Sequence, residues 1–229
     1  MLELKYIDRG YKESLVLIPG WATDYRVFGC LDIPYNYLLP VSFSPFSFAR
    51  ELREALDKRP LDKVSLLGWS MGGFLAADFC AQYPGRVNEL ILLGMREKYK
   101  PEALREINIK LVKNKKAWLY KFYQGLFTRK EVTKFRWFKE KLLKDYTGSI
   151  GLEDLALGLE YLSRVELDAR ALSGIKKIRV FHGQEDSVVP LAEAEGFGSC
   201  LPQAEFIRLP CAGHACFFSP AFKEKFFHE

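Results

Sequence analysis

The sequence lacks both a long apolar run and a cysteine framework. No 18 consecutive apolar residues occur among its 229 residues, which excludes an obvious membrane-spanning helix. Residues 1–10 already alternate charged and apolar side chains, unlike a signal peptide. The five cysteines are odd in number and irregularly spaced, as is typical of reduced thiols. We therefore expect a cytoplasmic protein without membrane association.

Metal-ligating side chains are scarce as well. The chain has only three histidines, His182, His214 and His228. Cys211, His214 and Cys216 are close in sequence, but three ligands within six residues lack the paired spacing of zinc sites. We therefore expect no metal and no other cofactor.

The composition is that of a globular protein with one strongly basic segment. Hydrophobic residues make up 48% of the chain, enough for a single core with at most one inserted subdomain. The net charge is +5, yet residues 96–146 alone contain 16 Lys and Arg against 6 Asp and Glu. The remaining residues, with 18 basic against 23 acidic side chains, are net acidic.

Short apolar runs alternate with helical segments along most of the chain. Apolar runs without a polar residue at every second position are typical of parallel strands buried on both faces. This order predicts an α/β fold with a doubly wound, mostly parallel sheet. The expected strands are Leu2–Asp8, Leu15–Ile18, Tyr37–Val41, Lys63–Leu67, Leu90–Leu93, Ile178–Phe181 and Glu205–Leu209. The expected helices are Phe48–Lys58, Gly73–Gln82, Leu191–Phe197 and Ala221–Phe227.

One segment is too long to be a single crossover between strands. Residues 96–165 are helical in composition and predict a cap inserted into a core formed by residues 1–95 and 166–229. Thr128 to Glu131 have the form of a capping box, and we expect a helix from there to about Tyr146. Its apolar arc contains Phe135, Phe138 and Leu142, and an adjoining basic arc contains Lys130, Lys134, Lys141 and Lys144.

A sharp turn bearing a serine is predicted where a strand meets a helix. Gly68-Trp69-Ser70-Met71-Gly72 lies between a strand-like and a helix-like run, in the pattern of a nucleophile elbow. Because glycine has no Cβ, the strand and the helix can approach closely, and the turn between them presents the serine hydroxyl. We expect Ser70 to be a nucleophile.

A serine nucleophile needs a general base and an acid that orients it. His214 follows the last predicted strand, and Asp186 follows the strand before it, at the sheet edge where open α/β sheets place their chemistry. We expect Asp186 as the acid, with Glu185 as the alternative. His182 is interpreted as structural, facing a backbone group at a strand end, and His228 is the penultimate residue.

An oxyanion formed on the substrate needs hydrogen-bond donors. The amide of Met71, directly after the serine, is one expected donor. The loop Pro19-Gly20-Trp21 after an early strand supplies the other, with Trp21 presenting its N–H while its ring walls the pocket.

The elbow, the order of the three residues and the inserted cap resemble the α/β-hydrolase superfamily over essentially the whole chain. More narrowly, residues 67–73, residues 19–21 and residues 158–167 resemble the pimeloyl-[acyl-carrier protein] methyl ester esterases of biotin synthesis. The resemblance implies hydrolysis of an acyl methyl ester on acyl-carrier protein. It also implies that Phe122 lines the acyl channel and that Lys121, Lys134 and Lys139 contact the acidic carrier.

The chain departs from that pattern at the pocket mouth. Pro19-Gly20 stands where many relatives have His-Gly, and Ser42 to Phe46 replaces a glycine-rich loop. Lysines also replace expected arginines in the cap, which weakens bidentate phosphate recognition.

The leading hypothesis is a monomeric carboxylesterase that uses Ser70, His214 and Asp186. A second hypothesis keeps this machinery but assigns a thioester or a small hydrophobic ester as substrate. A third is a non-catalytic binding protein with a hydrolase fold. Nucleic-acid binding is not expected, because the basic segment contains no recognised reading motif.

Overall fold

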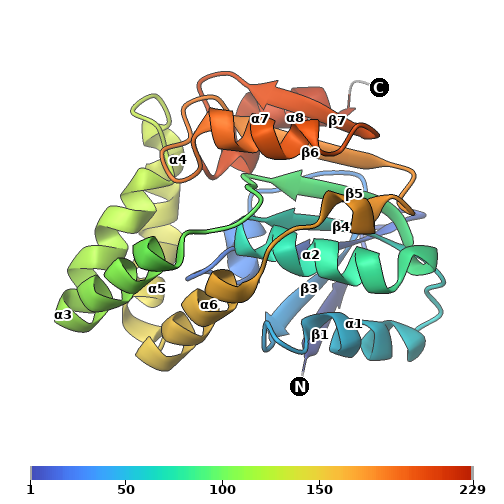
Figure 1. Cartoon of the computed structure of the whole chain (residues 1–229), viewed down its shortest axis with the longest axis horizontal. Helices are drawn as coiled ribbons and strands as arrows, with labels where there is room; N and C mark the ends of the chain where they lie inside the picture. The colour runs from blue at the N-terminus through green and yellow to red at the C-terminus, as the bar shows by residue number, and fades with distance from the viewer. Residues whose placement is uncertain (1, 228–229) are drawn as a thin grey trace.

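A seven-stranded sheet forms the centre of the molecule in the computed structural model, which describes residues 2–227 (Figure 1). The strand order is β1-β3-β2-β4-β5-β6-β7, and only β1 runs antiparallel to its neighbour. The strands are β1 (Glu3–Ile7), β2 (Ser14–Ile18), β3 (Asn36–Ser42), β4 (Val64–Trp69), β5 (Val87–Leu93), β6 (Ile178–Gly183) and β7 (Ala204–Leu209). The predicted fold class and all seven predicted strands are confirmed.

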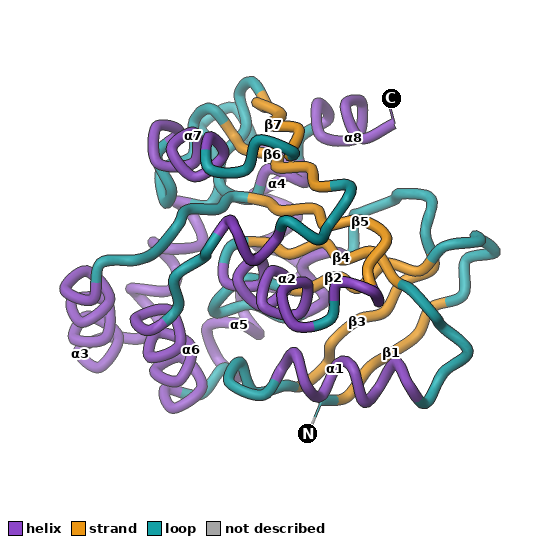
Figure 2. Tube along the Cα trace, turned by 45° about the vertical axis from the view of Figure 1, so that its right-hand side comes forward, coloured by secondary structure: helices purple, strands orange, loops and turns teal. Residues whose placement is uncertain are grey.

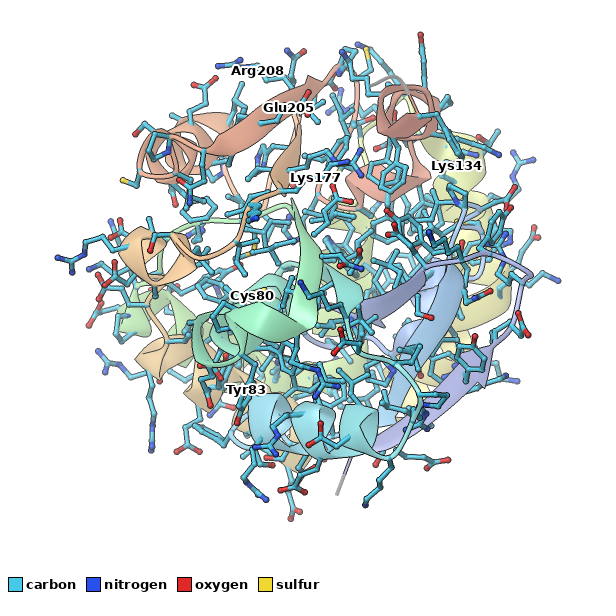
Figure 3. All side chains as sticks on the ribbon, turned by 90° about the vertical axis from the view of Figure 1, so that its right-hand side faces the viewer. Cys80, Tyr83, Lys134, Lys177, Glu205 and Arg208 are labelled. Atoms are coloured by element: carbon cyan, nitrogen blue, oxygen red, sulfur yellow. The ribbon has the colours of Figure 1, made fainter. Side chains whose placement is uncertain are left out.

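Helices cover both faces of the sheet. In Figure 3, α2 and α7 lie on one side of the sheet and α8 on the other, and Figure 1 shows the same arrangement from the front. The four predicted core helices are confirmed as α1 (Phe48–Asp57), α2 (Met71–Gln82), α7 (Leu191–Ser199) and α8 (Pro220–Phe227). The short helices are η1 (Tyr25–Phe28), η2 (Pro84–Arg86), η4 (Ala169–Leu172) and η5 (Cys216–Phe218).

The burial of the strands follows from this double covering. Every residue of β2, β4 and β6 is buried, whereas β1 at one edge of the sheet is partly exposed throughout. Fully burying one aliphatic side chain contributes about 1.5–3 kcal/mol. Burial of the central strands therefore holds the residues at their carboxyl ends firmly in place.

The helical segment 96–165 follows β5 and precedes β6 in the chain, and we call it the insert. Its helices are α3 (Pro101–Gly125), α4 (Val132–Phe138), the π-helical segment η3 (Lys139–Leu143), α5 (Lys144–Ser149) and α6 (Leu152–Arg164). They gather at the end of the sheet toward which β5 and β7 point (Figures 1 and 2). No helix within residues 2–227 combines the length and the apolarity that spanning a bilayer requires.

The helix expected from the capping box differs in two ways from the one observed. It begins at Val132, because Thr128 to Glu131 form a turn in which the Glu131 carboxylate accepts the Thr128 N–H at 2.8 Å. It then passes through the π-helical turn of η3 and ends at Ser149. Of the predicted apolar arc, Phe138 and Leu142 are buried.

Helix α3 contains a break that the sequence pattern did not predict. Asn114 has non-helical backbone angles, φ −159° and ψ 86°. Its side-chain oxygen accepts the Ala117 N–H at 3.0 Å and so caps the second half of the helix. The helix therefore changes direction at this break, and its carboxyl-terminal half, up to Gly125, follows a different axis from the first half.

Close packing at the start of α2 depends on a glycine. A Cβ added at Gly72 would lie 2.2 Å from the carbonyl oxygen of Ile18 and 2.6 Å from that of Pro19. Both atoms belong to the backbone at the end of β2, so neither can move aside without shifting the sheet. Gly72 thus sets the distance between α2 and the loop after β2.

We expect Gly72→Ala to lower the free energy of unfolding by about 3 kcal/mol or more, because the added methyl group overlaps backbone. Urea denaturation measures the change. Gly196→Ala in α7 is the matched control, since a Cβ there meets no atom within 4 Å. It should be neutral or stabilising by up to about 1 kcal/mol. Equal stability of the two variants would contradict this account of the elbow.

Candidate active site

Ser70 lies between β4 and α2 in a strained backbone conformation. Its φ is 54° and its ψ is −120°, in a region that non-glycine residues rarely adopt. The conformation is held because the Ser70 N–H donates to the Leu93 carbonyl of β5 at 2.8 Å. A Cβ at Gly68 would lie 2.4 Å from the Gly72 carbonyl oxygen, so strand and helix approach closely around this serine. The local structure is that of the expected elbow.

His214 and Asp186 form a buried pair beside this elbow. His214 Nδ1 lies 2.8 Å from Asp186 Oδ2, and both side chains are almost inaccessible to solvent. The other carboxylate oxygen, Oδ1, accepts the backbone N–H groups of Val188 and Val189 at 2.8 and 2.9 Å. Burial alone would raise the pKa of Asp186, but its interactions with His214, with His182 and with the Val189 N–H hold it below its ordinary value. An ionised Asp186 makes Nδ1 the protonated nitrogen and leaves Nε2 as the basic one.

Two residues hold His214 against the elbow and the end of β5. Gly94 follows β5 with a φ of 61°, and a Cβ there would lie 2.9 Å from Cε1 of His214. The imidazole therefore lies against the backbone next to Leu93, the residue that binds the Ser70 amide. On the elbow itself, Trp69 Nε1 donates to the His214 carbonyl at 2.9 Å. The residue before the serine thus anchors the backbone of the histidine.

The alternative acid Glu185 is placed elsewhere, whereas His182 lies beside the pair, with its Nε2 3.5 Å from Asp186 Oδ2. Glu185 is exposed and pairs with Lys130, with 3.0 Å between Oε1 and Nζ. His182 is fully buried and donates through Nε2 to the Val189 carbonyl at 3.0 Å, which confirms that it faces a backbone group. Burial lowers the pKa of His182. His228 lies outside the residues that the structure describes.

The loop after β2 borders the serine. A Cβ at Gly20 would lie 3.3 Å from the Ser70 Cβ, and Met71 is the first residue of α2. The indole N–H of Trp21 donates to the Leu155 carbonyl of α6 at 2.9 Å. Because the indole N–H is engaged, only the backbone amide of Trp21 remains for an oxyanion.

A cavity of about 380 Å³ adjoins this loop. Gly20, Trp21 and Met71 line it, together with the apolar side chains Val41, Phe43, Pro45, Ile150, Leu155 and Leu157. Asp24 and Asp154 also border it, and no basic side chain does. The volume falls within the range of small-molecule sites.

Phe122 lies on α3 at one end of an aromatic cluster. It stacks on Trp118, with ring centroids 5.4 Å apart, and its edge meets Trp21 at 5.2 Å. Phe122 is not among the residues that line the 380 Å³ cavity. It packs against Trp21 and thereby fixes one wall of the site.

Tyr99 and Arg96 were not predicted from the sequence, although both directly follow the carboxyl end of β5. Tyr99 is partly exposed, and burial raises its pKa, opposed by the Arg96 charge and by the Ser70 side chain. The Arg96 guanidinium lies 4.6 Å from the Tyr99 ring centroid and donates to the Val188 carbonyl at 2.8 Å. Their position after a central strand is the signal that could have identified them.

The three lysines assigned to carrier contact lie on the insert. Lys121 and Lys139 are exposed, and Lys134 is partly exposed and lies on the α8 side of the sheet in Figure 3. Within residues 2–227, none of the three has an acidic side chain within 4 Å. Their charges are therefore available to a partner.

No three His, Cys, Asp or Glu side chains in the described part of the chain are grouped so that they could hold a metal ion. Cys211 is exposed, with its Sγ 3.4 Å from Lys130 Nζ, whereas Cys216 is buried. These two thiols and His214 do not share one site.

Comparison with known proteins agrees with the fold. A pimeloyl-[acyl-carrier protein] methyl ester esterase of Nitrosomonas europaea is 25% identical over 188 residues, 77% of this chain and 73% of the relative. The enzyme of the same name from Yersinia pseudotuberculosis is 28% identical over 232 residues, 90% and 88% of the two chains. An esterase from Exiguobacterium antarcticum superposes with a TM-score of 0.80 at 19% identity, over 98% of this chain and 92% of its own.

A family model described as the alpha/beta hydrolase fold matches residues 19–138, a range that contains the loop after β2, the elbow and the first half of the insert. Since the match covers more than half of the 229 residues, the chain belongs to the alpha/beta hydrolase fold family.

Proposed function

We propose that this protein is a serine carboxylesterase. The observation that carries the proposal is the strained Ser70 on its elbow beside a buried His214–Asp186 pair. A serine held at positive φ is destabilising by about 1–3 kcal/mol, and such strain is typical of an elbow that directs a nucleophile toward substrate. A binding protein with the same fold would have no need of that strain.

The reaction follows from the protonation states of the three side chains. His214 Nε2 accepts the proton of Ser70 Oγ while Oγ attacks the ester carbonyl carbon. The backbone amides of Met71 and Trp21 stabilise the resulting oxyanion. His214 then gives its proton to the departing alkoxide, which leaves as an alcohol. Water adds to the acyl-enzyme by the same route, its proton passing to His214 and then to Ser70.

We propose an acyl methyl ester as substrate, carried on acyl-carrier protein as in the biotin-synthesis esterases that this chain resembles. The names of the relatives support this substrate, and the largely apolar cavity wall, with two aspartates and no basic side chain, favours a neutral ester over a free acid. The unpaired Lys121, Lys134 and Lys139 give an acidic carrier a surface to approach. The insert, residues 96–165, would act as the cap over the acyl chain, with Phe122 behind Trp21 at its wall.

The runner-up is an esterase or thioesterase that acts on small acyl substrates. The same three residues would serve, and the 380 Å³ cavity accommodates a short acyl group. In that case the lysines have no partner. A monomer in the cytoplasm stays our prediction, and the free thiols of the described cysteines suit a reducing compartment.

We expect Ser70→Ala to lower kcat for ester hydrolysis by about 10³-fold or more, because the nucleophile is lost. The fold should be retained, as monitored by circular dichroism. Hydrolysis of a short-chain nitrophenyl ester provides the assay. Residual activity above about a tenth of wild type in a folded variant would rule out Ser70 as the nucleophile.

Asp186→Asn should reduce kcat by about 10⁴-fold, as in well-studied triads, since an amide favours the wrong histidine tautomer. Glu185→Gln is the comparison, because it removes only an exposed ion pair with Lys130. We expect it to change kcat by less than about threefold. If Glu185→Gln lowered kcat by the large factor instead, the acid would be Glu185 rather than Asp186.

The lysines can be tested separately from the chemistry. Reversing Lys121, Lys134 and Lys139 to Glu should raise KM for a carrier-linked ester severalfold. The effect should fade at high salt, because the Debye length falls from about 10 Å at 0.1 M to about 3 Å at 1 M. For a small soluble ester, kcat/KM should change by less than about threefold.

A matched control reverses Lys12, Lys58 and Lys63, three exposed lysines outside the insert, and alters the net charge equally. It should leave KM for the carrier-linked ester nearly unchanged. Equal losses on carrier-linked and free esters would mean that the insert lysines support structure only. No loss on either substrate would leave the insert lysines without a partner.

A further inference from the structure

Two hydrogen bonds connect the insert to the loop that carries His214. The Gly213 N–H donates to Glu131 Oε2 at 3.1 Å, and the Ala215 N–H donates to the Leu126 carbonyl at 3.0 Å. The residues on both sides of His214 are therefore bound to the turn between α3 and α4. Contact is close, since a Cβ at Gly213 would lie 2.7 Å from the Leu126 oxygen.

Glu131 is an unusual residue for this position. Its side chain is buried, with 7% of the residue exposed, and Oε2 accepts the Thr128 N–H as well as that of Gly213. Its second oxygen, Oε1, has no hydrogen-bond partner among the described residues. Burial raises the pKa of Glu131, opposed by the two backbone N–H groups. Burying a carboxylate with an unpaired oxygen is unfavourable.

A helix cap alone does not account for that unfavourable burial. A cap requires only the bond to Thr128, which an exposed side chain could make equally well. The second bond, to Gly213, reaches 82 residues along the chain to the residue before the proposed general base. The bond to Gly213, which fixes the backbone beside the histidine, therefore gives a reason for burying this carboxylate.

The other side of the site is held by the same insert. The Tyr123 hydroxyl, on the last turns of α3, donates to the Ala22 carbonyl. Ala22 has a φ of 61°, so this hydrogen bond supports a strained residue next to Trp21. Tyr123 and Leu126 are three residues apart, and together they connect α3 to the loop after β2 and to the histidine loop.

We propose that Glu131 is a positioning residue for His214: its carboxylate oxygen holds the Gly213 amide and keeps the imidazole aligned between Ser70 and Asp186. The inference rests on the proposed esterase function. Glu131 acts as a hydrogen-bond acceptor and transfers no proton. Its effect should therefore appear in kcat and leave substrate binding nearly unchanged.

The test compares Glu131→Gln with Glu131→Met on a small soluble ester. The glutamine oxygen can accept both N–H groups, so kcat should stay within about threefold of wild type. Methionine fills similar volume but leaves both N–H groups unpaired. It should lower kcat about tenfold or more, which corresponds to about 1.4 kcal/mol, with KM changed by less than about threefold. A fluorophosphonate that labels Ser70 should react more slowly with the Met variant by a similar factor.

Glu131→Asp provides a second route if the Met variant does not fold. It keeps the charge, but it is one methylene too short to reach Gly213 while capping Thr128, so we expect the same loss of kcat. Lys130→Ala is the control, because it removes a neighbouring surface contact to Glu185 and should leave kcat unchanged.

Full kcat in a folded Met or Asp variant would overturn the positioning role and leave the esterase proposal intact. So would a rise in KM at constant kcat. If the wild-type protein neither hydrolyses esters nor reacts with the fluorophosphonate at Ser70, the proposed function itself fails. Loss of kcat in Met and Asp but not in Gln is the expected result.

Discussion

The left-handed backbone of Ser70 is the constraint on which the rest of the site depends. A φ of 54° at a non-glycine residue is held only if its surroundings over-determine it. Here β5 binds the Ser70 amide, and the two elbow glycines let α2 and β2 close around the turn. The geometry also aims the first turn of α2 at the serine. One backbone feature thus sets both the proposed nucleophile and the proposed oxyanion donor.

That feature was predictable because it is local. Gly68-x-Ser70-x-Gly72 specifies a turn within five residues, and short apolar runs specify buried parallel strands. Asp186 and His214 could be selected because parallel strands bring their carboxyl ends to one edge of the sheet. The structure places these two side chains 2.8 Å apart, with Glu185 turned to the surface. The order of the strands in the sheet therefore indicated that these two residues meet, although they are separated in sequence.

The insert was less predictable, since its details depend on tertiary contacts. Helical composition indicated helices but neither the break at Asn114 nor the π-helical turn after Phe138. The same holds for Glu131. A capping box explains its contact with Thr128, whereas its contact with Gly213 exists only because a distant loop packs there. No local pattern distinguishes a glutamate that caps a helix from one that also holds another loop.

The insert thus has two surfaces with different physical roles. Its outer face is rich in lysine, and exposed charges act over a Debye length and vary with salt. Its inner face makes buried hydrogen bonds to the backbone of both loops beside Ser70, and such bonds depend on geometry rather than on salt. Substitutions on the outer face should therefore change encounter with a partner, and substitutions on the inner face should change the chemical step. A segment inserted between β5 and β6 is well placed for both, because the carboxyl ends of the strands end beneath it and solvent lies beyond it.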